Sequence, residues 1–170
     1  MRSDAPRPRP RARGRVAAPW HNHDDILDGV TVSKVMSTDL KTISAEADLQ
    51  EARAAFKRHA IHHLLVDDRG RVVGVLSDRD VVRRLSPYAG TAAAQRRDED
   101  TLRRKVFQAA TYALVAVPHT ALVQEAAATL LERGISSLPI VDDEDRVVGI
   151  VTTRDLLRGM LACTVAPHTP

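Results

Sequence analysis

The chain has 170 residues, 44% hydrophobic and 28% charged, which suits a soluble protein that buries one sizeable core or two small ones. No apolar run approaches the roughly 20 residues of a membrane-spanning helix, and no apolar segment follows the charged N-terminus as a secretory signal requires. The single cysteine, Cys163, excludes an internal disulfide and a cysteine-based zinc cluster. These features favour a cytoplasmic protein with no membrane association.

The net charge of +3 is distributed unevenly along the chain. Residues 1–20 hold six arginines and one aspartate, whereas the rest of the chain holds 19 basic and 21 acidic residues. Prolines alternate with these arginines and exclude a helix or a central strand, so residues 1–25 are predicted to form a disordered Arg/Pro-rich arm. Such an arm is either a solvated tail or a segment that contacts nucleic acid or an acidic partner.

After the arm, the hydrophobic pattern predicts a strand at 42–43 and a helix at 49–59 with apolar residues at helical spacing. Two short strands follow at 62–66 and 72–76, joined by an acidic turn suited to a hairpin. A second helix is predicted at 78–85. This first unit therefore reads strand–helix–strand–strand–helix.

The same order of elements is predicted a second time. A strand at 112–117 precedes a helix at 123–133, which Gly134 is placed to terminate. Strands at 137–141 and 147–151, again with an acidic turn, precede a helix at 153–161. The second unit therefore has the βαββα order of the first.

The two units are an internal repeat. Residues 66–80 and 141–155 are identical at nine of 15 positions, at a spacing of 75 residues, and Gln50-Glu51-Ala52 matches Gln124-Glu125-Ala126 at a spacing of 74. One unit alone is near the lower size limit for independent folding. We therefore expect two α/β (α+β) units that pack as a pseudo-twofold pair with a cleft along the seam. The predicted first unit covers residues 30–86 and the second covers residues 105–162. Residues 87–104 are the linker between them, and residues 163–170 are the tail.

Each unit contains the element Gly-h-h-[Ser/Thr]-x-Arg-Asp, where h is hydrophobic, between its last strand and last helix. One interpretation is structural, because a hydroxyl followed three residues later by a carboxylate resembles a capping box. The other is a binding site: free amides, a hydroxyl and a guanidinium suit phosphate, and a carboxylate can accept both ribose hydroxyls. Duplication of the whole element favours the second interpretation, a nucleotide site.

With these motifs the sequence resembles the tandem cystathionine β-synthase (CBS) domain, or Bateman module, over residues 30–161. The matching features are Val32-Ser33-Lys34-Val35-Met36, the two Gln-Glu-Ala helices, residues 135–142 (ISSLPIVD) and both Gly-h-h-[Ser/Thr]-x-x-Asp elements. The resemblance implies two CBS domains whose clefts bind an adenosine-containing ligand such as AMP, ADP, ATP or S-adenosylmethionine, with no required cofactor.

The resemblance also implies roles for individual residues. Asp80 and Asp155 would hold ribose hydroxyls, and Ser77, Thr152 and the adjacent Arg79 and Arg154 would contact phosphate. The adenine would lie between aliphatic side chains and backbone near Thr42, Ile43, His63, Ala116, Val117, Leu138 and Pro139. The second unit has a proline and one more residue at Leu138-Pro139-Ile140 than the first has at Leu64-Leu65, so the two clefts are expected to differ and at most one to bind tightly.

The remaining candidates are less specific. His62 and His63 are adjacent in a predicted strand and would face opposite sides, so a shared metal ion is not expected. Trp20-His21-Asn22-His23-Asp24-Asp25 lacks structural-zinc spacing. No catalytic triad context or glycine-rich phosphate loop is present, so the chain is not predicted to be an enzyme.

Two functions from different classes are therefore considered. The first is a stand-alone regulator that binds an adenosyl ligand and signals to a protein partner. The second is an interaction protein without a ligand, which dimerises through its helices and uses the arm to contact nucleic acid or an acidic partner. Apolar residues of the second helices would serve as a homodimer face in either case or simply as core: Val81, Val82, Leu85, Leu156, Leu157, Met160 and Leu161.

Overall fold

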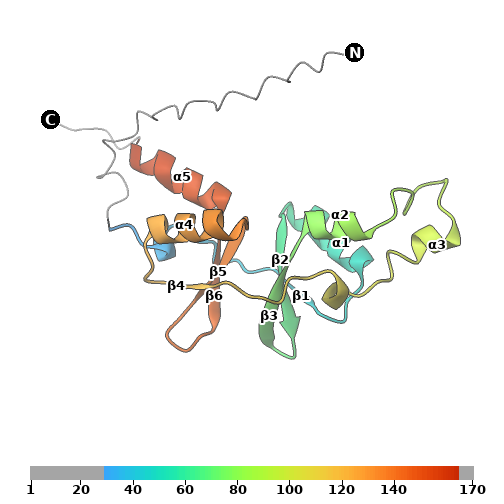
Figure 1. The fold of residues 1–170 in the computed structure, drawn as a ribbon, viewed down its shortest axis with the longest axis horizontal. Helices are drawn as coiled ribbons and strands as arrows, with labels where there is room; N and C mark the ends of the chain where they lie inside the picture. Colours follow the sequence, from blue (N-terminus) through green and yellow to red (C-terminus); the bar gives the residue numbers. More distant parts are fainter. Residues whose placement is uncertain (1–28, 165–170) are drawn as a thin grey trace, which may run out of the picture.

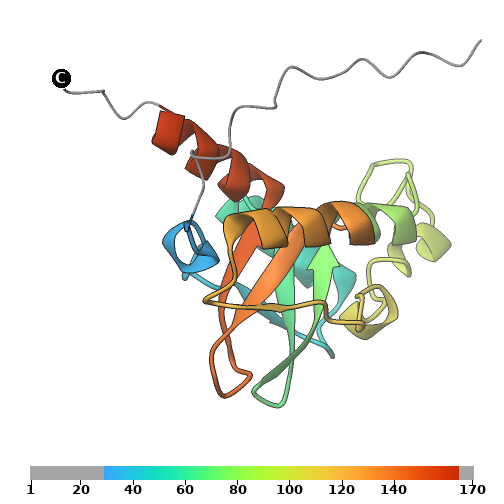
Figure 2. The same ribbon diagram turned by 60° about the vertical axis from the view of Figure 1, so that its left-hand side comes forward.

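The computed structural model describes residues 29–164, with two similar units side by side (Figures 1 and 2). The predicted arm (1–25), the histidine-containing stretch 20–25 and most of the predicted tail lie outside the described residues. Within the described residues, no helix is long and apolar enough to cross a membrane.

The first unit consists of β1 (Thr42–Ser44), α1 (Leu49–His59), β2 (His63–Asp68), β3 (Arg71–Ser77) and α2 (Asp78–Arg84). The sheet has the order β1-β2-β3, with β1 parallel and β3 antiparallel to β2. The crossover from β1 to its parallel neighbour β2 is made by α1, as parallel pairing requires. Both helices lie above the sheet in the view of Figure 1.

The second unit repeats this topology with β4 (Val117–Pro118), α4 (Val123–Arg133), β5 (Ser137–Val141), β6 (Val147–Thr152) and α5 (Thr153–Thr164). The predicted βαββα order is confirmed in both units, and Gly134 ends α4 with a left-handed φ of 63°. The strand predicted at 112–117 is wrong for most of its length. There Thr111 makes a single bridge to Val75, and the Leu114 amide donates to the Tyr112 carbonyl in a turn, so that only Val117 and Pro118 remain in the sheet.

The segment between the units contains a short helix, α3 (Arg96–Glu99). Asp98 is buried there because its carboxylate accepts hydrogen bonds from the Ser86 hydroxyl at 2.6 Å and the Gln95 amide at 2.8 Å. These bonds hold the pKa of the Asp98 carboxyl below its usual range. The segment is thus fixed to the end of the first unit rather than extended from it.

The opening segments of the two repeats are exchanged in space. The 3₁₀ turn η1 (Val32–Lys34) precedes the first unit in sequence, yet Val32 is fully buried in the core of the second unit. The 3₁₀ turn η2 (Val106–Gln108) precedes the second unit, yet Val106 is fully buried in the core of the first. Backbone hydrogen bonds fix both crossings, from the Val32 amide to Ala121 at 2.8 Å and from the Phe107 amide to Ala45 at 3.0 Å. Each unit therefore completes the other's core, which holds the seam together.

Candidate functional site

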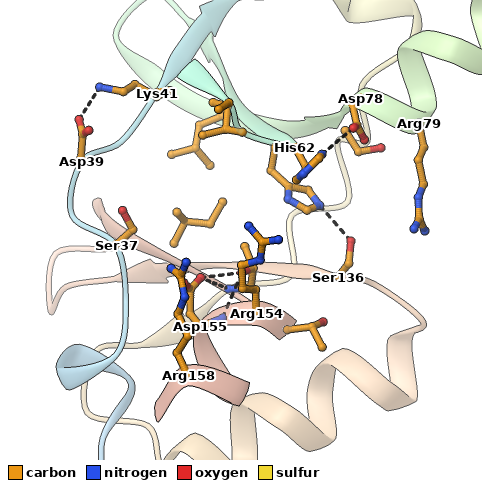
Figure 3. A pocket seen from close by; sticks show the side chains of 18 residues that line it. Ser37, Asp39, Lys41, His62, Asp78, Arg79, Ser136, Arg154, Asp155 and Arg158 are labelled. Atoms are coloured by element: carbon orange, nitrogen blue, oxygen red, sulfur yellow. Dashed lines mark hydrogen bonds and ion pairs between the residues drawn. The ribbon is translucent and has the colours of Figure 1, made fainter. Parts of the chain in front are cut away.

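A cavity of about 670 Å³ lies at the seam between the two units (Figure 3). The first unit contributes the segment before β1, the start of β2 and the β3–α2 junction. The second unit contributes Ser136 and the β6–α5 junction with the first turns of α5. Its volume falls in the usual range for small-molecule sites, and any molecule that fills it contacts both units.

The β6–α5 junction places a hydroxyl and a carboxylate at the cavity. Asp155 Oδ2 accepts hydrogen bonds from the Thr152 amide at 2.9 Å and the Thr152 hydroxyl at 2.6 Å. The Asp155 amide in turn donates to the Thr152 hydroxyl at 3.4 Å. This is the capping-box geometry predicted from the motif. It orients the carboxylate through one oxygen and leaves Oδ1 without a hydrogen-bond partner among the described residues.

The equivalent junction in the first unit has the same local geometry but a different neighbour. Asp80 Oδ2 accepts from the Ser77 hydroxyl at 2.5 Å and the Ser77 amide at 3.3 Å, and a capping box forms. Asp80 Oδ1, however, lies 4.0 Å from the Arg83 guanidinium. Arg158 is the equivalent of Arg83, and it lines the cavity instead of pairing with a carboxylate.

Four cationic side chains line the cavity: Lys41, Arg79, Arg154 and Arg158. The Lys41 ammonium is paired with Asp39 at 2.5 Å. Within residues 29–159, the side chains of the three arginines have no ion-pair or hydrogen-bond partner. In Figure 3, Arg79 projects from α2, whereas Arg154 and Arg158 project from α5 on the other side. An anion in the cavity would therefore meet free guanidinium groups from both units.

Two histidines line the cavity, and one of them connects its two walls. His62 Nδ1 lies 2.7 Å from a carboxylate oxygen of Asp78, and His63 Nε2 lies 2.9 Å from the Ser136 hydroxyl of the other unit. Burial lowers the pKa of His63, and the nearby Asp78 carboxylate only partly offsets this. His63 is therefore the neutral partner of a hydrogen bond that spans the seam. Contrary to the expected opposite orientations, both rings line the cavity, because β2 begins at His63 and His62 lies in the preceding bend.

Aliphatic side chains form the rest of the wall. Ala60, Ile61 and Leu65 come from the first unit and Ile150 comes from the second. A planar, apolar group can lie between such walls without an aromatic partner. The cavity therefore combines an apolar part, an oriented carboxylate and cationic side chains, which matches the three chemically different parts of a nucleotide.

Six of the thirteen residues named from the sequence line this cavity: His63, Ser77, Arg79, Thr152, Arg154 and Asp155. The other seven lie outside its lining: Thr42, Ile43, Asp80, Ala116, Val117, Leu138 and Pro139. Leu138 and Pro139 are fully buried in the second unit.

Sequence reasoning missed several lining residues, notably Ser37, Lys41, Ile61 and Arg158. Arg158 had a usable signal, because it follows Arg154 by four residues and so shares its helix face. Ser37 had none, because it reaches the cavity through a bridge to Ile150 of the other unit. The crossing of the seam by this segment is not encoded in any local pattern.

Comparison with known sequences agrees with this geometry. The sequence model of the CBS domain matches residues 32–87 and again residues 106–162. The chain belongs to the CBS domain family. Its two units are therefore a CBS domain pair, as the resemblance in the motifs implied.

Relatives and solved structures support the same assignment. The chain is 30% identical over 131 residues to an uncharacterized 17.7 kDa protein of Acidianus ambivalens, covering 76% of this chain and 73% of that protein. The CBS domain pair of protein MJ0100, solved with 5′-methylthioadenosine and S-adenosyl-L-methionine, is 25% identical with a TM-score of 0.62, covering 75% of this chain and 93% of that one. The cytosolic domain of the Mg²⁺ channel MgtE, solved with ATP, is 27% identical with a TM-score of 0.56, covering 72% and 46%. Similar CBS pairs thus bind adenosyl ligands.

Proposed function

We propose that this CBS pair is a regulatory module that binds an adenine nucleotide or a related adenosyl ligand in the seam cavity. The observation that carries the proposal is the convergence of Asp155, an apolar wall and three arginines without a partner among the described residues, in one cavity shared by both units. The bound adenosyl ligands of the similar CBS pairs support the ligand class.

In this proposal each part of the ligand has its own partner. Asp155 Oδ1 accepts the ribose hydroxyls, since Oδ2 is already occupied by Thr152. Arg154 and Arg158 bind phosphate near the first turn of α5. The adenine lies between Ile61, Leu65 and Ile150.

The regulatory step follows from the position of the cavity. A ligand that contacts both units shifts their relative arrangement only if it binds one arrangement better than another. The contacts it would compete with or reinforce are the His63–Ser136 hydrogen bond and the Ser37–Ile150 bridge. A protein partner would read the altered surface.

We also propose that the chain forms a homodimer through its helices. Val82 of α2 and Leu157 of α5 occupy equivalent positions in the two units and are 71% and 55% exposed. Val81 and Leu156 beside them are buried, so these two belong to the cores. Light scattering of the purified chain and of a Val82→Glu/Leu157→Glu variant should show a dimer and a monomer, respectively.

Thermal unfolding with AMP, ATP and S-adenosylmethionine tests ligand binding. A ligand at 100 times its dissociation constant should stabilise the fold by about 2.7 kcal/mol. Asp155→Ala should abolish this shift, whereas Asp80→Ala is the matched control, because it removes the equivalent capping carboxylate of α2 but no side chain that lines the cavity. Absence of any shift would contradict the proposal. Salt-sensitive retention on DNA that requires residues 1–25 would then favour the ligand-free interaction protein.

A further inference from the structure

The three cavity arginines are divided between the two units. Arg154 and Arg158 lie one turn apart on α5, whereas Arg79 lies on α2 of the other unit (Figure 3). Two carboxylates that line the same cavity are paired, Asp39 with Lys41 and Asp78 with His62, and Asp155 accepts hydrogen bonds from Thr152 through Oδ2 and keeps Oδ1 for the ribose. The arginines are thus the groups left to bind an anion.

A nucleoside monophosphate would engage only part of this set. A single phosphate carries roughly −2, and with the ribose at Asp155 it would lie beside Arg154 and Arg158 on the same helix. Arg79 would remain unpaired on the opposite side of the seam. A longer phosphate chain offers further oxygens in the geometry that a guanidinium fork binds bidentately, and Arg79 is the arginine that lines the cavity from the unit opposite α5.

We infer that the cavity selects adenine nucleotides with two or three phosphates over the monophosphate, and that Arg79 is the residue that determines this selectivity. This inference rests on the proposed function, since it takes the ribose position from Asp155. Arg79 binds the phosphates beyond the first from the unit opposite α5. The phosphate chain then links α2 to α5, and the binding of di- or triphosphate ties the two units together where the monophosphate does not.

Isothermal titration of the full chain with adenosine, AMP, ADP and ATP tests the inference. The wild-type chain should bind ADP and ATP at least about tenfold more tightly than AMP, because the longer chain adds charge-assisted hydrogen bonds. Arg79→Ala should weaken ADP and ATP about tenfold and leave AMP within about twofold. Arg79→Lys keeps the charge but loses the bidentate guanidinium fork, so its ADP and ATP affinities should lie between those of the wild-type chain and of Arg79→Ala.

Arg84→Ala is the matched control, because Arg84 is an exposed arginine of the same helix that does not line this cavity. It should leave all four affinities unchanged. Equal wild-type affinities for AMP and ATP, or an equal loss of AMP and ATP affinity in Arg79→Ala, would overturn the inference while leaving the proposed function standing. Failure of the wild-type chain to bind any of the four ligands would overturn the inference, and it would overturn the proposed function as well if S-adenosylmethionine also gave no thermal shift.

Discussion

The two sides of the seam share a backbone but differ in the side chains they present. Ser37, Asp39 and Lys41 line the cavity beside Asp155, and the repeat spacing of 74 residues makes Thr111, Ala113 and Val115 their equivalents in the second repeat. The backbone crossings are equivalent, since Ser37 bridges Ile150 and Thr111 bridges Val75. Duplication has therefore kept the scaffold and changed its chemistry, and charge is concentrated on one side.

The arginines show the same divergence. On the Asp80 side Arg83 lies 4.0 Å from the carboxylate that would hold a ribose, whereas on the Asp155 side Arg158 is free to face the cavity. A carboxylate with a neighbouring guanidinium is a poorer acceptor for a neutral hydroxyl. This difference favours Asp155 as the ligand-binding carboxylate.

The largest effect is expected from breaking the exchange of opening segments. Val32→Ala and Val106→Ala should each destabilise the fold by about 2 kcal/mol, because both side chains are fully buried. Hydrogen exchange should localise the effect of Val32→Ala to β5 and β6 of the second unit, and that of Val106→Ala to β2 and β3 of the first unit. In each case this is not the unit that the substituted segment precedes in the sequence. Ser33→Ala, at an exposed position, should change neither. Faster hydrogen exchange in the unit that follows the substituted segment in the sequence would contradict the exchange of opening segments.

A second effect on stability, of similar size, distinguishes the two glycines where the segments cross. A Cβ on Gly74 would lie 2.6 Å from the Thr111 backbone oxygen, whereas a Cβ on Gly149 would meet the Met36 side chain, mainly its sulfur. Gly74→Ala should therefore cost about 1–3 kcal/mol, and Gly149→Ala less, because Met36 can move aside. Chemical denaturation of both variants measures this order, and Met36→Ala should rescue Gly149→Ala. The reverse order would show that the crossing at Gly74 is the more adaptable.

A smaller effect is expected when a charged residue of the cavity is replaced by its uncharged equivalent from the other repeat. Lys41→Val introduces the residue found at the equivalent position 115. Because Lys41 is partly exposed and paired with Asp39, the loss in ATP affinity should be modest, about two- to fivefold. Lys34→Val, at an exposed position outside the cavity, is the control in the same titration. An unchanged affinity in Lys41→Val would mean that this lysine does not contribute to the anion site.

The smallest effect is the pH dependence of stability that His63 causes. The equivalent residue in the second unit is Ser137, which does not titrate. Burial lowers the pKa of His63 below 6.5, so the unfolded chain binds its proton first as the pH falls. The stability contributed by neutral His63 should be complete above pH 6.5 and be lost as the pH falls through the lower, folded-state pKa. Urea unfolding between pH 7.5 and 5 should show this loss.

His63→Gln keeps a polar group next to Ser136 but does not titrate, so its stability should depend less on pH over the same range. The groups that face His63 are Asp78, Asp80, Arg79 and His62, together with Ser136. Identical pH profiles for the two chains would assign the pH dependence to one of these other groups.

Local sequence patterns are enough to predict the repeated βαββα order, the helix bounds at 49–59 and 123–133 and both capping motifs, because each depends on local spacing or hydrogen bonds between near neighbours. They also show which residue types are available to bind a nucleotide. They do not show which of the duplicated motifs faces a charged cavity. That outcome depends on segments 32–41 and 106–115 crossing the seam, and contacts between residues more than 70 positions apart leave no periodic signal. The same crossing brought Ser37, Lys41 and Arg79 to one site. It also left only Val117 of the strand predicted at 112–117 in the sheet, since Thr111 bonds to Val75 of the other unit and the Leu114 amide donates to the Tyr112 carbonyl.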